Sequence, residues 1–117
     1  MVLIKENHIS AIGGITEAVQ KIKKNIDSNL PIEVEVKNIQ ELKEALQLDI
    51  NRIMLDNMEL SEIRKSVKIT NAKIPLEVSG NVTLDNVMDI ALTGVDYISI
   101  GMITHSVKAL DISLLIN

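Results

Sequence analysis

The stretch from Leu76 to Ser106 constrains the fold more than any other part of the chain. A short apolar run ends at residues 79–81 (Ser-Gly-Asn), and a segment with helical periodicity follows over residues 84–91. A second apolar run, residues 95–100, then ends at Gly101. Two strands joined by a crossover helix form a βαβ unit, in which the strands are parallel. The sequence therefore predicts two parallel strands that each end in a glycine-containing loop.

The helix of this unit has clear expected limits and an expected core face. Thr83 can cap its start, and Gly94 suits the left-handed position after its end. Its apolar side chains recur at i, i+3, i+4 and i+7, which predicts burial of Leu84, Val87, Met88 and Ala91.

The two glycines, Gly80 and Gly101, follow the strands at the end where α/β barrels bind ligands. Glycine lets backbone N–H groups approach a phosphate closely, so a phosphate site is one interpretation. The alternative is that both glycines only make turns, as they do in many α/β proteins.

The same alternation runs through the whole chain. Apolar runs predict five strands, at residues 2–4, 32–37, 52–55, 75–78 and 95–100. Helical periodicity predicts one helix between each pair of strands, at residues 15–26, 38–46, 59–69 and 84–91, and a tail at 112–116 is a short final apolar element. The polar residues 5–8 are predicted as a strand ending. This order predicts a single α/β domain with a parallel sheet.

The composition fits such a domain and excludes several classes of protein. Among 117 residues there are one Tyr, no Phe and no Trp, so Ile, Leu and Val must fill the core, as in parallel strands buried on both faces. A net charge of -4 argues against a nucleic-acid surface, and the absence of Cys excludes disulfides and thiolate chemistry. No apolar run approaches the roughly 18 residues of a membrane span, and the N-terminus lacks signal-peptide features. We therefore expect a cytoplasmic protein.

Polar residues at the strand ends favour a barrel over an open doubly wound sheet. One such residue lies at or near the carboxyl end of each strand: Lys5, Glu35, Asp56, Ser79 and Gly101. In a barrel these positions converge on one mouth, whereas in an open sheet they spread along an edge. The sequence predicts a partial (β/α) TIM-like barrel of five parallel strands alternating with helices.

The second strand carries two carboxylates on one face, Glu33 and Glu35, in strict alternation with apolar residues. A strand covered on both faces is normally apolar, and a buried unpaired carboxylate is costly. We expect both side chains to point into the barrel or toward its mouth, with Glu33 in a structural, salt-bridged role. The alternative is an edge strand with one face in water.

The motifs at these strand ends resemble the quinolinate phosphoribosyltransferase family, also called nicotinate-nucleotide pyrophosphorylase (carboxylating). The matching segments lie in the family's order and spacing over essentially the whole chain: residues 4–9 (IKENHI), 33–36 (EVEV), 53–57 (IMLDN), 77–82 (EVSGNV), 94–101 (GVDYISIG) and 104–106 (THS). Two residues depart mildly, because the family more often has Asp at Glu6 and a second Gly at Asn81.

The resemblance implies an activity and a site. The reaction would join quinolinate and phosphoribosyl pyrophosphate, with magnesium, into nicotinate mononucleotide, pyrophosphate and carbon dioxide, a step of NAD synthesis. Catalytic roles fall to Lys5, Glu35 and Asp56, with magnesium at Glu35 and Asp56, since magnesium prefers carboxylate oxygens. The 5′-phosphate would lie against Ser79, Gly80, Gly101 and His105. His105 could instead be a structural histidine, and for His8 the structural interpretation is preferred.

The resemblance also implies what surrounds this chain. Residues 1–117 correspond to the C-terminal part of the family's barrel domain, without the N-terminal domain and the first barrel strands. We expect a homo-oligomer with small-molecule substrates, no nucleic acid and no membrane, and little activity from this part alone. Two alternatives stay open: a paralogue encoded near molybdate transporters, and a non-catalytic phosphate-binding or assembly module.

Overall fold

One sheet with its strands in sequential order organises the molecule. The computed structural model describes residues 1–103 and 109–115. The strands lie in the order in which they occur in the chain: β1 (Val2–Ile4), β2 (Ile32–Val36), β3 (Arg52–Asp56), β4 (Leu76–Ser79), β5 (Tyr97–Ile103) and β6 (Ala109–Leu115). β1 to β5 pair in parallel, and β6 pairs antiparallel with β5. The expected class, an α/β fold with five parallel strands, is confirmed.

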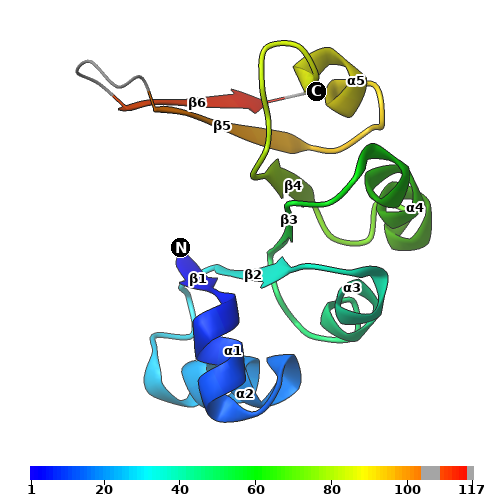
Figure 1. The fold of residues 1–117 in the computed structure, drawn as a ribbon. Coiled ribbons are helices and arrows are strands. Elements are labelled where there is room, and N and C mark those ends of the chain that lie inside the picture. Colours follow the sequence, from blue (N-terminus) through cyan, green and yellow to red (C-terminus); the bar gives the residue numbers. More distant parts are fainter. Residues whose placement is uncertain (104–108, 116–117) are drawn as a thin grey trace.

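The helices lie along the outer side of the curve made by β1 to β4 (Figure 1). Their bounds are α1 (Glu6–Ile12), α2 (Ile15–Asn25), α3 (Ile39–Ala45), α4 (Leu60–Thr70) and α5 (Val87–Ala91). The sequential strand order is that of (β/α) barrels and not of doubly wound sheets, whose order reverses at a switch point.

Alternate residues of each strand face the helices and form the core. Val34, Ile53, Leu55 and Ile98 are each 0% exposed, and helix residues such as Ala18 and Leu42 pack into the same cluster. Because side chains alternate along a strand, the intervening polar residues point to the other, inner face of the sheet. β2 lies between β1 and β3, so the alternative of an edge strand with a wet face is wrong.

Two helices, not one, connect β1 to β2, which corrects the predicted single helix. Residues 6–12 form α1, although the polar run after Lys5 was expected to be a strand ending. Helix α1 has no fully buried residue, and Gly13, at φ 110°, ends it in the left-handed conformation. A short, mostly polar helix gives a weak periodic signal, which explains the miss.

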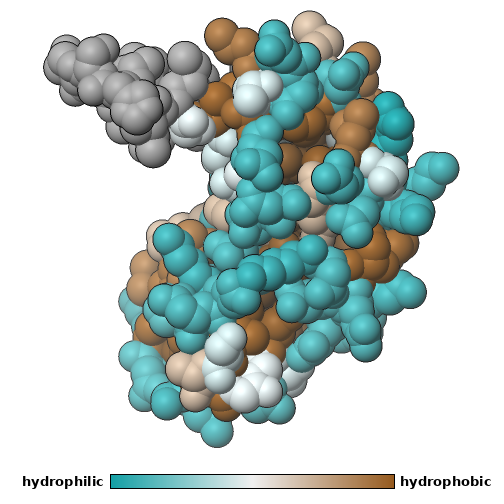
Figure 2. Space-filling model, in the orientation of Figure 1, coloured by the Kyte–Doolittle hydropathy of each residue, from teal (hydrophilic) through white to brown (hydrophobic). Residues whose placement is uncertain are grey.

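The helix before β5 is shorter than predicted. It begins at Val87, because Thr83 and Asn86 exchange hydrogen bonds in a preceding turn: Thr83 N to Asn86 Oδ1 (2.8 Å) and Asn86 N to Thr83 Oγ1 (3.3 Å). Leu84 and Met88, expected in the core, are 69% and 66% exposed, and Ile90 is the buried residue. Figure 2 shows hydrophobic surface over α5, whereas the face over β1 to β3 is mainly hydrophilic.

Strand β5 does not end at Gly101 as predicted. It continues to Ile103, and Gly101 pairs with Asp111 of β6. The final apolar element is therefore the second strand of a hairpin, which extends away from the remainder of the sheet (Figure 1). None of the helices among the described residues has the length and apolar character needed to cross a membrane.

Candidate active site

Three predicted residues converge where β1, β2 and β3 end. Lys5 directly follows β1, Glu35 is the penultimate residue of β2, and Asp56 is the last residue of β3. These strands are parallel neighbours, so their carboxyl ends form one rim. The predicted rim of Lys5, Glu35 and Asp56 is present in the structure.

Burial and the charged groups at this rim shift the pKa of Glu35. Burial raises this pKa above its usual value, and the nearby Asp56 carboxylate raises it further. The backbone N–H of Glu6 and the ammonium groups of Lys5 and Lys37 act in the opposite direction. Glu35 and Asp56 thus form a close carboxylate pair that a cation would stabilise.

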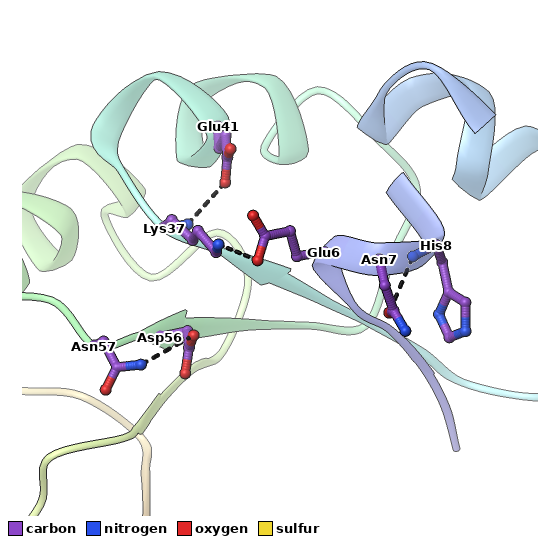
Figure 3. A network of polar contacts seen from close by, with 7 residues as sticks. All are labelled: Glu6, Asn7, His8, Lys37, Glu41, Asp56 and Asn57. Carbon is purple, nitrogen blue, oxygen red and sulfur yellow. Dashed lines mark hydrogen bonds and ion pairs between the residues drawn. The ribbon is translucent and has the colours of Figure 1, made fainter. Parts of the chain in front are cut away.

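Helix α1 and Lys37 border the same rim (Figure 3). The Lys37 ammonium forms an ion pair with Glu6, and this contact raises the pKa of Lys37. His8 Nδ1 accepts a hydrogen bond from the backbone N–H of Lys5 (3.3 Å), a contact that agrees with the preferred structural interpretation of His8. Lys5 is thereby placed at the start of α1, beside Glu35.

The Ser79–Asn81 loop continues the rim at the end of β4. Ser79 pairs with Asp56 in the sheet register, and Asn57 N donates to Ser79 O (3.0 Å). Gly80 and Asn81 adopt φ values of 78° and 56° in the left-handed region. A Cβ on Gly80 would lie 2.7 Å from Asn57 Cγ, so glycine is required here by its protein neighbour. The loop needs Gly80 for packing whether or not an anion binds.

Backbone donors remain available in this loop. Of the hydrogen bonds formed among the described residues, none uses the N–H of Gly80 or Asn81. A cavity of about 180 Å³ lies beside them, between the ends of β3 and β4 and the helices α4 and α5. Glu59 and Asp89 line this cavity, and their charges disfavour an anion inside it.

The remaining predicted phosphate residues are not brought to this loop by the described structure. Gly101 lies inside β5, two residues before its end, so it is not a strand-end glycine. His105 lies outside the described residues. Their proposed roles stay predictions.

A polar layer lies below the rim on the inner face of the sheet and consists of Glu33, Arg52, Glu77, Tyr97 and Ser99. Most of its contacts were not predicted from the sequence. Arg52 donates to Glu77 Oε2 (3.3 Å) and stacks 3.9 Å above the Tyr97 ring centroid, while Ser99 Oγ donates to Glu77 Oε1. Glu33 is 5% exposed and Glu77 is 7% exposed. The register brings Glu33 opposite Arg52 and Glu77 opposite Tyr97, a signal that needs the strand pairing.

Glu33 and Glu77 differ in ionisation. Burial and the adjacent Glu77 raise the pKa of Glu33 to about 8. Burial also raises the pKa of Glu77, but hydrogen bonds with Glu33, Ser99 and Arg52 outweigh burial and bring it below its usual value. Glu33 is therefore the protonated partner near neutral pH, and Glu33 Oε1 is buried without a hydrogen-bond partner among the described residues. Within the part of the chain that the structure describes, Arg52 pairs with Glu77 and Glu33 forms no salt bridge, contrary to the expectation.

The donor set at the rim fits magnesium. Glu35 and Asp56 supply carboxylate oxygens, and magnesium is commonly held by one or two carboxylates with waters and substrate phosphates completing its shell. No cluster of three or more acidic or histidine ligands occurs in the part of the chain that the structure describes. Two carboxylates suit a magnesium ion that binds together with a phosphate substrate, whose oxygens would supply further ligands.

The sequential parallel sheet and its charged carboxyl-end rim are those of a (β/α)-type domain, a class in which ligands bind at the carboxyl ends of the strands. The model of the quinolinate phosphoribosyl transferase C-terminal domain matches residues 1–115. The chain belongs to this family.

Named relatives agree with the family match. A nicotinate-nucleotide pyrophosphorylase [carboxylating], chloroplastic, from Oryza sativa is 44% identical over 100% of this chain and 36% of its own length. The solved nicotinate-nucleotide pyrophosphorylase of Francisella tularensis superposes with a TM-score of 0.83 at 47% identity, covering 97% of this chain and 40% of that one. That of Ehrlichia chaffeensis gives 0.79 at 52% identity, with 83% and 35% covered. The chain thus spans less than half the length of these relatives.

Proposed function

We propose that this chain contributes the strand-end rim of an enzyme that transfers a phosphoribosyl group to quinolinate with decarboxylation, giving nicotinate mononucleotide for NAD synthesis. The convergence of Lys5, Glu35 and Asp56 at the carboxyl ends of three adjacent parallel strands carries the proposal. The names of the relatives support the same reaction.

The chemistry of the rim suits this transfer. Breaking the bond between the anomeric carbon and oxygen releases pyrophosphate, so negative charge grows on the leaving group. Glu35 and Asp56 would hold the magnesium ion, which when bound neutralises that charge. Lys5 supplies a fixed cation for a phosphate or for a quinolinate carboxylate, and its place at the start of α1 orients it.

The Ser79–Asn81 loop would bind the 5′-phosphate. Its free N–H groups at Gly80 and Asn81 and the Ser79 hydroxyl are suitable donors for phosphate oxygens. Gly101 and His105 would complete the site once the substrate is bound.

A titration tests the proposal. Calorimetry with phosphoribosyl pyrophosphate, with and without magnesium, should show magnesium-dependent binding that Asp56→Asn weakens at least tenfold. Asp49→Asn is the matched control, since Asp49 is exposed and lies in the loop before β3, on the amino-terminal side of the strands. The affinity of this variant should stay within twofold of that of the parent. Equal affinities for both variants would contradict the assignment. If the assembled protein binds phosphoribosyl pyrophosphate but does not bind quinolinate, the alternative of a non-catalytic phosphate-binding module would be favoured.

The cytoplasmic location and the homo-oligomeric state remain parts of this proposal. The rice relative is named as chloroplastic, so the compartment varies within the family. Fractionation of the native cells tests the location, and sedimentation of the purified protein tests the assembly.

A further inference from the structure

Asn57 lies between the two halves of the proposed site. Its Nδ2 donates to Asp56 Oδ2 (3.3 Å), as Figure 3 shows, and its backbone N–H donates to Ser79 O (3.0 Å). Its side chain also fills the space beside Gly80, where an added Cβ would lie 2.7 Å from Asn57 Cγ. One residue therefore contacts both the carboxylate of β3 and the loop after β4.

The backbone of Asn57 is adapted to this place. Its φ of 52° is left-handed, a conformation that Asn tolerates better than most residues other than glycine. This turn brings the amide back over Asp56 and against Gly80 instead of continuing β3. On the far side of the loop, Asn86 Nδ2 donates to Asn81 O (2.8 Å), so amide side chains fix the loop from two sides.

We propose that Asn57 is a positioning residue that couples the Asp56 carboxylate to the Ser79–Asn81 phosphate loop. The inference rests on the proposed function and deepens it. Asn57 is assigned no direct contact with the magnesium ion or the reacting atoms. It sets the direction of the Asp56 carboxylate through its amide N–H and the position of Gly80 through packing, so the metal and the 5′-phosphate bind in one fixed relation.

Two substitutions separate these contacts. Asn57→Gly keeps the left-handed backbone but removes the whole amide, whereas Asn57→Asp keeps the shape beside Gly80 but replaces the N–H donor with an oxygen that repels Asp56. Asn71→Gly is the matched control, because Asn71 is also left-handed, at φ 48°, but caps α4 before the start of β4.

The readouts are the affinities for ribose 5-phosphate without magnesium, which probes the loop, and for phosphoribosyl pyrophosphate with magnesium. Asn57→Gly should weaken both at least tenfold. Asn57→Asp should weaken the magnesium-dependent affinity at least tenfold and the ribose 5-phosphate affinity by less than threefold. Asn71→Gly should leave both within twofold. A merely structural role predicts equal losses in the two assays for Asn57→Asp, and that result would overturn the inference.

A measurement without ligand keeps the two proposals separate. In the free chain, Asn57→Gly should speed hydrogen exchange of the backbone amide at position 57, which donates to Ser79 O, at least tenfold relative to Asn71→Gly. If the parent binds neither ligand, the proposed function fails for this chain while the exchange rates still decide the role of Asn57. Unchanged exchange in Asn57→Gly would refute it.

Discussion

Single residues on the inner face of the sheet decide how this domain responds to pH. The pKa of Glu33 is raised from 4.5 to about 8, because burial and Glu77 favour its protonated form. A carboxyl whose pKa is higher in the folded state favours folding while it holds its proton. Its contribution is present at low pH and is lost as the pH rises from about 4.5 through about 8.

Glu33→Gln should therefore change the pH profile of stability. The parent's melting temperature should fall between about pH 5 and about pH 8, and that of the variant, whose residue 33 stays neutral, should fall less. Glu77, whose pKa is lowered, is already ionised over this range and does not add to the slope. Circular dichroism melts across this range measure the effect, with Glu59→Gln, an exposed carboxylate outside the layer, as control. Parallel profiles for parent and Glu33→Gln would contradict it.

Some residues of the candidate site could be predicted from the sequence, and others could not. The convergence of Lys5, Glu35 and Asp56 was predictable because each lies at or near the carboxyl end of a predicted strand, and parallel strands end on the same side of the sheet. The Arg52–Glu77–Ser99 contacts were not, because they join three strands through their register, which no local pattern encodes. Gly80 was found, but its neighbour Asn57 was not, since a φ of 52° in Asn leaves no periodic signal.

The helices of this domain differ in how clearly their apolar residues show helical periodicity. Helices α2, α3 and α4 were predicted from apolar spacing, and Asn38 caps α3, its Oδ1 accepting a hydrogen bond from Glu41 N (2.8 Å). Helix α1 carries no fully buried residue, and α5 has only five residues. Periodicity therefore gave no signal for α1, although α3 has the same length, because α1 lacks a buried face, and it overestimated the length of α5.

Helix α5 gives a prediction at this scale. Ile90 is 5% exposed and Met88 is 66% exposed, although the sequence pattern had placed Met88 in the core. Ile90→Ala should lower the free energy of unfolding by about 2–4 kcal/mol, as loss of buried methyl groups does. Met88→Lys should change it by less than about 0.5 kcal/mol. Urea unfolding of both variants measures this, and a large loss for Met88→Lys would show that Met88 is buried in solution.

For the whole molecule, the described sheet has two unpaired edges, β1 and β6, and three apolar side chains in and around α5 are exposed: Leu84, Met88 and Leu92. Open edges and exposed apolar surface favour association with another polypeptide. The purified 117-residue chain should therefore self-associate, and sedimentation velocity should show species larger than 12.9 kDa that depend on protein concentration. A single monomeric species at all concentrations would contradict this expectation.

The 117-residue chain alone should also fail to turn over quinolinate, because the reaction must hold two polyanions in one fixed geometry. Bidentate arginine contacts are the natural means of binding carboxylates, but Arg52 is engaged by Glu77 and Arg64 lies on helix α4. At the rim, Lys37 is paired with Glu6, which leaves Lys5 as the cation nearest Glu35 that has no ion-pair partner among the described residues. The relatives are more than twice as long, so we expect turnover only when the remaining part of such a relative is supplied. An assay for nicotinate mononucleotide, with the chain alone and with that part added, tests this, and steady production by the chain alone would show that its own rim suffices.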